Sequence, residues 1–255
     1  MSSRAVMLIL SALCSCTVLE DRDSCPCLLH LDVDESAAYV ADSLRIWISG
    51  DGFSYVTDLS SSQYADGITV PVGTRSGVHI AVMDIASAGD SPDGSLSIPL
   101  GGQCPDVFDF RTFCDTSGES VEQHIRLHKN HCRVSVFFPE AAAGGYSVVI
   151  AGNVNGYSSR GDMQDGEFVC ETFADDTGYF VFCIPRQKDG GLNMKISRED
   201  GSPRVFALGN YIIDSGYDWT AEDLEDVEIS VDYAAGVIRL HIEGWPDCEV
   251  EDVVI

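Results

Sequence analysis

One cysteine near the N-terminus stands where exported bacterial proteins receive a lipid. Arg4 precedes a short apolar run over residues 5–13, and the sequence LCSC follows directly, ending at Cys16. A positive start, a short apolar segment and small residues before a cleavage point are typical of a secretory signal. Leucine three positions before Cys16 and serine directly before it fit a lipobox, in which the thiol becomes a diacylglyceryl cysteine. We therefore predict a signal peptide over residues 1–15 and lipidation of Cys16.

Two alternatives concern the same segment. An ordinary signal peptide could contain cysteines without lipidation. Cys14 could instead be the acceptor, but a bulky leucine precedes it where a small residue is expected. The apolar run is too short to span a bilayer, which needs about 20 apolar residues. Cys16 remains the favoured site.

A second group of residues has the side chains of a metal site: His124, His128 and His131, with Cys132 beside them. On an extended strand His124 and His128 would lie about 13 Å apart at 3.3 Å per residue, so they could not bind one ion. A helix would bring them together, but the alternating pattern favours a strand. Hydrolase, zinc-protease and phosphate-loop motifs are not present in the sequence. We therefore predict no metal, no cofactor, no catalytic residue and no enzyme activity.

Composition narrows the class of protein further. The net charge is −26 with only 15 Lys and Arg, which excludes nucleic acid as a partner because phosphate binding needs clustered basic residues. Such a chain is also repelled by anionic lipids, so the link to a membrane would be the lipid on Cys16. The apolar fraction of 45% is that of a globular protein.

Eight cysteines follow Cys16 at wide and irregular spacings. This pattern does not indicate a small disulfide scaffold. The sequence leaves open whether one long-range disulfide forms or whether the thiols are free and buried.

The elements that must carry these residues are mostly short strands. Residues 16–27 form an acidic tether, which fits either an export signal of surface lipoproteins or a solvated linker. Alternation of apolar and polar residues then predicts strands over residues 28–34, 43–49, 68–72, 78–83, 95–100, 123–127, 133–139, 146–151, 179–184, 193–197, 227–233 and 237–243. Residues 219–224 predict a short helix with Thr220 as its N-cap. The chain is therefore expected to be all-β, with two β-sandwich domains over residues 28–128 and 129–255.

Four pieces of the chain carry a resemblance to a known family. They are Cys25 and Pro26 after the tether; IRLHKN over residues 125–130; Gly152, Asn153, Gly156 and Tyr157, with Gly161 and GEF over residues 166–168 beyond; and Gly216, Tyr217, Asp218, Trp219 and Leu224, followed by Asp232 and Tyr233. In this order, and after a lipobox, they resemble the FimB-like fimbrial anchor family of the Bacteroidales. The second piece resembles its interdomain strand, and the third its second-domain loop. We interpret the aromatic residues as core and the glycines as turn residues with positive φ.

The resemblance implies a fold and a function. Members of this family are outer-membrane lipoproteins with two transthyretin-like Greek-key β-sandwich domains. They are expected at the cell surface, where they hold the base of a type V fimbrium to the cell. They are thought to terminate its growth and to join the shaft pilin by strand complementation. The tail over residues 246–255 fits a donated strand, but the last strand of the protein's own sheet is favoured. A tip or accessory adhesin and a glycan-handling surface lipoprotein are the alternatives.

Overall fold

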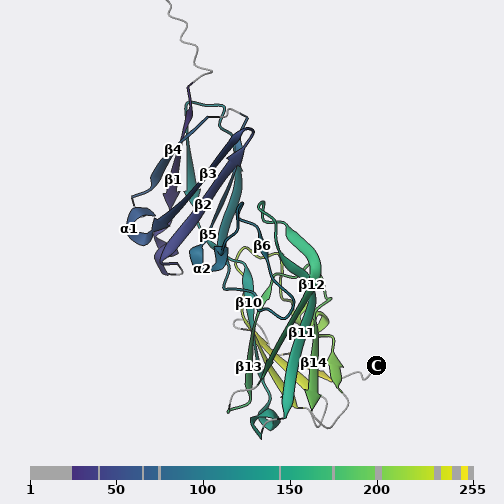
Figure 1. Cartoon of the computed structure of the whole chain (residues 1–255). Helices are drawn as coiled ribbons and strands as arrows, with labels where there is room; N and C mark the ends of the chain where they lie inside the picture. Colours follow the sequence, from purple (N-terminus) through teal and green to yellow (C-terminus); the bar gives the residue numbers. More distant parts are fainter. Residues whose placement is uncertain are drawn as a thin grey trace, which may run out of the picture.

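Alternating apolar and polar residues build the strands of this chain. In β1 (Cys27–Val33) every second side chain is buried and the others are exposed, which is the period of a strand with one face on a core. The computed structural model shows two β-sandwiches arranged end to end (Figure 1). It describes residues 25–39, 41–64, 66–73, 76–143, 145–173, 176–198, 203–232, 237–242 and 248–251. The predicted all-β fold with two tandem sandwiches is confirmed.

The first sandwich packs a three-stranded sheet on a five-stranded one. Besides β1, its strands are β2 (Ser43–Gly50), β3 (Phe53–Ser60), β4 (Ile68–Val72), β5 (Val78–Asp84), β7 (Phe108–Cys114), β8 (Ser120–Ile125) and β9 (His128–Lys129). The strand orders are β4-β1-β8 and β3-β2-β5-β7-β9. Leu29, Ile46 and Val82 are fully buried or nearly so between the two sheets.

The second sandwich has longer strands and a larger core. Its strands are β10 (His131–Phe137), β11 (Tyr146–Tyr157), β12 (Met163–Phe173), β13 (Tyr179–Pro185), β14 (Asn193–Arg198), β15 (Arg204–Phe206), β16 (Val227–Asp232), β17 (Val237–Ile242) and β18 (Cys248–Glu251). They form the orders β13-β10-β16-β17-β18 and β12-β11-β14-β15, and β6 (Leu96–Ser97) adds to the end of β11. In both sandwiches the first strand pairs in parallel with a later one, β1 with β8 and β10 with β16.

The C-terminal tail belongs at least partly to the protein's own sheet. β18 pairs antiparallel with β17, with Ile238 opposite Val250. This favours the second interpretation of the tail over a donated strand. The last four residues, 252–255, lie outside the described part of the chain.

Helices are short and peripheral. They are η2 (Glu35–Tyr39), α1 (Ser61–Tyr64), α2 (Ile85–Ala88), η3 (Pro139–Ala143) and α3 (Leu208–Asp214). Among the described residues, no helix is long and apolar enough to cross a membrane.

Strands that were not predicted from the sequence include the three-residue β15 and the longer β3, β7 and β12. β3, β7 and β12 show irregular burial along their length, because β3 and β12 lie at sheet edges and expose parts of both faces. Conversely, the strand predicted over residues 95–100 is reduced to the two residues of β6. The boundary between residues 128 and 129 stays a prediction.

Candidate functional site at the junction of the two sandwiches

The predicted lipid site, Cys16, lies outside the described residues, as does Tyr233. The described chain starts at Cys25 and Pro26, which are exposed. β1 follows directly and begins at the end of the first sandwich that faces away from the second (Figure 1).

The junction between the sandwiches is organised around Arg186, which follows β13. Its guanidinium donates hydrogen bonds to Asn130 Oδ1 and to the carbonyl of Ala221, both at 2.7 Å, and a further one to the carbonyl of Trp219. Its backbone N–H donates to the Tyr157 hydroxyl at 2.7 Å, and that hydroxyl donates to the carbonyl of Asn130 at 2.6 Å. Burial raises the pKa of Tyr157 well above its usual value, so the hydroxyl keeps the proton that this bond needs.

Two carboxylates of the C-terminal motif bind the segment that connects the sandwiches. Asp223 accepts a hydrogen bond from the backbone N–H of Lys129 at 2.7 Å. Asp226 accepts one from the backbone N–H of Arg133 at 2.8 Å and one from Lys129 Nζ at 2.6 Å. The N–H of Leu224, which is buried, donates to the carbonyl of Lys129 at 3.0 Å. Because Lys129 ends β9 and Arg133 lies in β10, this loop ties both sandwiches together.

The aromatic residues of the same loop pack against each other. The rings of Tyr217 and Trp219 are buried with their centroids 4.7 Å apart. Burial raises the pKa of Tyr217 far above its usual range, and its hydroxyl donates to the carbonyl of Glu225 at 2.7 Å. Asp218 accepts hydrogen bonds from the N–H and hydroxyl of Thr220 at 2.8 and 2.6 Å. These contacts shape the loop that meets Arg186.

The short helix predicted over residues 219–224 is wrong. Arg186 takes the carbonyl of Ala221, and the N–H of Leu224 goes to Lys129. Backbone groups that a helix would pair internally are thus bound to other segments.

A helix does precede the motif, and Gly216 ends it. Gly216 has φ 94° after α3, and its N–H donates to the carbonyl of Ile213 while that of Tyr217 donates to Ile212. This is a Schellman motif, which needs a left-handed residue and therefore favours glycine. The motif begins with glycine for this reason.

Residues 96–107, which we call the strap, cross the open side of the second sandwich. β6 at its start pairs with the end of β11. Further along, the N–H of Gly101 donates to the carbonyl of Val169 in β12 at 2.8 Å, and that of Cys104 donates to Cys183 in β13 at 3.0 Å. Its three core side chains are almost fully buried in the second hydrophobic cluster: Ile98, Cys104 and Val107. The strap therefore crosses the outer edge of β12 at Val169 and that of β13 at Cys183.

The glycines of the third piece serve close packing as well as turns. A Cβ on Gly156 would lie 2.0 Å from the carbonyl oxygen of Leu96, so glycine lets the strap pair with β11. Gly161 has φ 92°, as a turn residue would. Gly152 does not have a positive φ, so the turn interpretation is wrong there; a Cβ would instead lie 2.6 Å from Gln187 Oε1. The predicted second-domain loop is also wrong, because this piece lies in β11 and β12, where the pairing is irregular.

The remaining motif residues lie at the surface of the second sandwich or at the end of a strand. Asn153 Nδ2 donates to Asp189 Oδ1 at 3.0 Å. Asp232 is the last residue of β16 and stands opposite Val237. These two residues are not brought to Arg186.

The three histidines point to different partners. His124 Nδ1 is 2.9 Å from Asp32 Oδ2, and this contact raises the pKa of its exposed imidazole. His128 Nδ1 is 3.5 Å from Asp223. His131 is buried at the start of β10. The histidines therefore form no joint metal site among the described residues, although His131 has other neighbours.

Sheet edges are the second feature of functional interest. Edge strands are protected in proteins by shortness, proline, charge or a covering segment. β4 contains Pro71, β8 exposes Glu122, β15 and β18 are short, and the strap crosses β12 and β13.

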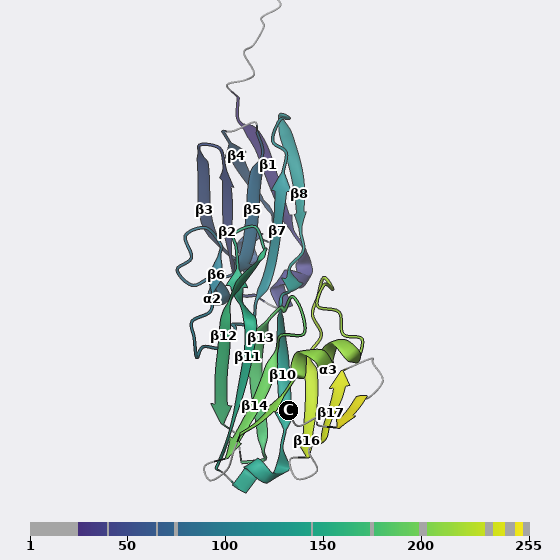
Figure 2. The same ribbon diagram turned by 90° about the vertical axis from the view of Figure 1, so that its right-hand side faces the viewer.

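β3 has fewer of these protections, because its one charged side chain, Asp58, is paired with Arg45 of the neighbouring β2. It is eight residues long, has no proline and lies at the margin of its sheet (Figure 2). Val56 is 49% exposed and Tyr55 36%. A hollow beside it is lined by Trp47, Val56 and Pro92 among others. Within the described residues, β3 pairs along its length with β2 alone. This edge can accept a further strand.

Comparisons with known proteins show which solved structures share this architecture. No protein-family model and no curated protein matches the sequence. Among solved structures, the fimbrial anchor protein Mfa2 of Porphyromonas gingivalis matches 87% of this chain and 98% of its own, with TM-score 0.55 and 12% identity. The chain has the fold of a fimbrial anchor protein. The resemblance inferred from the sequence motifs is thereby confirmed at the level of the fold.

Two further structures have the same fold. A candidate polysaccharide-binding protein of Bacteroides thetaiotaomicron covers 91% of this chain and 100% of its own, with TM-score 0.60 and 10% identity. A candidate adhesin of the same species covers 89% and 98%, with TM-score 0.55 and 11% identity. The Mfa2 fold is thus shared by proteins described in different functional terms.

Arg186 and the strap are not apparent from the sequence motifs. Arg186 lies outside the four motif pieces, although it binds two of them and the Tyr157 hydroxyl of a third. The signal available for the strap was a stretch of Gly, Pro and Asp interrupted by single apolar residues, which is typical of any loop.

Proposed function

We propose that this chain is an outer-membrane lipoprotein that anchors the base of a type V fimbrium to the cell and terminates its growth. The observation that supports it most is the match to Mfa2 over nearly the whole of both chains. The lipobox at Cys16 supplies the membrane attachment. The described chain begins at the end opposite the second sandwich, so the second sandwich would extend away from the membrane (Figure 1).

The anchor would join the shaft pilin by strand complementation at β3. An added strand gains main-chain hydrogen bonds along an exposed edge, and its alternate side chains fix the register. β3 offers eight residues of such an edge, and the hollow beside Trp47 and Val56 can receive a side chain of the partner. β3 is the favoured acceptor because, within the described part of the chain, it is unpaired on one side along all eight residues, whereas β4 contains a proline, β15 and β18 are short, and the strap crosses β12 and β13.

Replacement of the lipid acceptor tests the anchoring role. In the host cell, Cys16→Ala should move this chain from the membrane to the soluble fraction and shaft pilin from washed cells to the culture medium. Cys25→Ser, at an exposed cysteine nine residues later, is the matched control and should leave both attached. The proposal fails if the Cys16 variant stays tightly membrane-bound and the fimbriae stay on the cells.

A charge on the β3 edge tests the mode of attachment. Val56→Lys should reduce co-purification of shaft pilin at least tenfold while this chain stays in the membrane, because lysine on an edge disfavours strand addition. Val205→Lys, at a similarly exposed valine of the three-residue β15, is the control. Equal pilin recovery with both variants would exclude β3 as the acceptor.

An adhesin is the second candidate, and one observation favours it. A hollow at the far end of the second sandwich is lined by Tyr146, Phe173 and Arg198 among others. Phe173 is 72% exposed, and the Arg198 guanidinium lies 5.6 Å from the centroid of the Tyr146 ring. An exposed ring beside an arginine suits a sugar or an acidic ligand. Phe173→Ala with reduced adhesion and normal fimbrial attachment would favour this function.

A further inference from the structure

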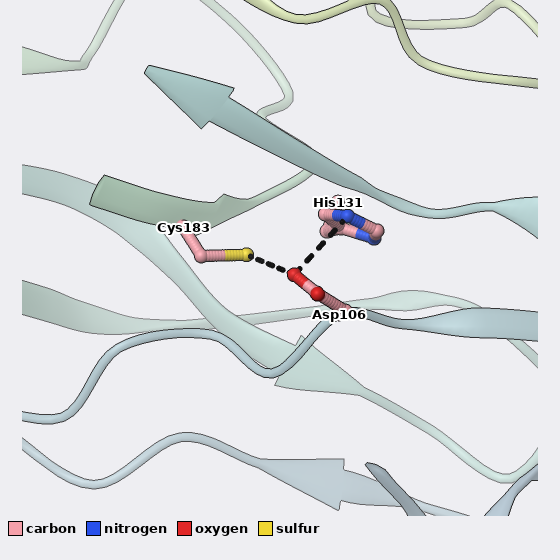
Figure 3. A group of neighbouring side chains, drawn as sticks. All are labelled: Asp106, His131 and Cys183. Carbon is pink, nitrogen blue, oxygen red and sulfur yellow. Dashed lines mark hydrogen bonds and ion pairs between the residues drawn. The ribbon is translucent and has the colours of Figure 1, made fainter. Parts of the chain in front are cut away.

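A nitrogen, an oxygen and a sulfur converge where the strap meets the second sandwich. Asp106 comes from the strap, His131 from β10 and Cys183 from β13 (Figure 3). Asp106 Oδ1 is 3.4 Å from His131 Nε2 and 3.6 Å from Cys183 Sγ, and the three donor atoms all lie within 4.8 Å of one another. His131 and Cys183 are buried, whereas Asp106 is exposed, so the cluster has a route from solvent.

The imidazole of His131 is oriented as a metal ligand would be. Its Nδ1 lies 3.1 Å from the carbonyl oxygen of Val107. A carbonyl can only accept, so Nδ1 carries the proton and Nε2 is directed at Asp106 and Cys183. Metal-binding histidines commonly donate their second ring N–H to a backbone carbonyl in this way.

The three groups have too few protons for their contacts. A neutral His131 presents a lone pair at Nε2 to Asp106 Oδ1, which is also an acceptor. The Cys183 thiol has one proton, and it can serve only one of its two oxygen neighbours, Asp106 Oδ1 or the carbonyl of Pro105. A divalent cation between the three donor atoms would satisfy all of them. The competing arrangement is a charged His131 paired with Asp106.

The types of the three donor atoms and the distances between them fit a zinc ion. Zn²⁺ binds Cys, His and Asp tetrahedrally, with bonds that place neighbouring ligand atoms roughly 3.3–3.8 Å apart. The two shorter separations here already match. Arg133 holds the Asp106 carboxylate through Nε at 3.3 Å and through its terminal nitrogen, which fixes the carboxylate orientation from outside. Cys104 lies beside Cys183, because its backbone N–H donates to the carbonyl of Cys183 at 3.0 Å.

We propose that Asp106, His131 and Cys183 bind one zinc ion, which fastens the strap to the second sandwich. Binding releases the Cys183 thiol proton to solvent and leaves a thiolate on the metal. The ion would join three segments that lie on the strap, β10 and β13, and so would close the side of the sandwich that the strap covers.

Metal titration of the full lipidated chain tests this site. The protein is purified in detergent with a reductant, stripped with a chelator and titrated with Zn²⁺ or Co²⁺. We expect one Zn²⁺ per chain, a thiolate-to-cobalt charge-transfer band and a higher Tm with zinc. Cys183→Ser should abolish the band and weaken zinc binding at least tenfold. Cys170→Ser, at a buried thiol in β12 outside the cluster, should change neither.

A second variant guards against loss of folding. Asp106→Asn alters a partly exposed side chain and should weaken zinc binding at least tenfold in a folded protein. The proposal is overturned if the wild-type chain binds no zinc, or if Cys170→Ser weakens binding as much as Cys183→Ser. A Cys104–Cys183 disulfide in the protein as isolated from its cells would also overturn it, because the thiolate would not be available.

Discussion

Replacing Arg186 by methionine should lower the free energy of unfolding of the full chain by about 3 kcal/mol. The change removes the donors to Asn130 Oδ1 and to the carbonyls of Trp219 and Ala221 at once. These acceptors lie in a partly buried junction, where an acceptor left without a partner costs more than a hydrogen bond gains. Methionine keeps most of the apolar stem of arginine, so the decrease in the free energy of unfolding measures the contribution of the guanidinium.

Two further variants separate charge from geometry. Arg186→Lys should recover only part of the loss, because an ammonium cannot bind three acceptors in the planar arrangement of a guanidinium. Arg160→Met removes an arginine from the exposed turn after β11 and should cost under about 0.5 kcal/mol. Denaturant unfolding followed by fluorescence gives the free energies. Equal stability of the Arg186 and Arg160 methionine variants would mean that the junction does not depend on Arg186.

Gly156→Ala should destabilise the chain by about 3 kcal/mol and loosen the strap. The new Cβ would lie 2.0 Å from the carbonyl oxygen of Leu96 and 2.9 Å from its carbon. These are backbone atoms, so the clash can be relieved only by moving the strap away from β11. The amide of Ile98, which donates to Asn155 at 2.7 Å, should then exchange its hydrogen faster.

Gly73→Ala is the matched control for this substitution. A Cβ on Gly73 meets nothing within 4 Å, and Gly73 does not have a positive φ, whereas Gly156 has φ 156°, so the difference between the variants includes the backbone strain of alanine at Gly156 as well as the clash. The free energy of unfolding of the Gly73→Ala variant should stay within about 0.5 kcal/mol of the wild type or rise slightly, because alanine restricts the conformations of the unfolded chain. If Gly156→Ala unfolds at the same denaturant concentration as Gly73→Ala, the strap is not held at β6.

The strands that could be predicted from the sequence are those with one buried face. β1 and β16 alternate residue by residue, because each residue of a strand points to the opposite face from its neighbour. β3 could not be predicted in this way, since a strand at the margin of a sheet has a poorly defined inner face. The prediction of a helix at residues 219–224 was wrong for a related reason. The Thr220 hydroxyl donates to Asp218 and caps no helix, and Arg186 and Lys129 bind the backbone groups of Ala221 and Leu224 from outside.

By itself, the sequence determined the all-β class, and it predicts the signal segment and the lipid acceptor Cys16. These depend on neighbours along the chain, which a local pattern records. Only the tertiary structure decided the strap, the bonds of Arg186, and the meeting of Asp106 with Cys183, which are 77 positions apart in sequence. From the sequence, His131 could be considered only beside His124, His128 and Cys132, where no metal site is predicted, because sheet topology, not spacing, sets which side chains meet across a core. That topology follows from burying apolar faces of the whole chain together, and no short window of residues contains it.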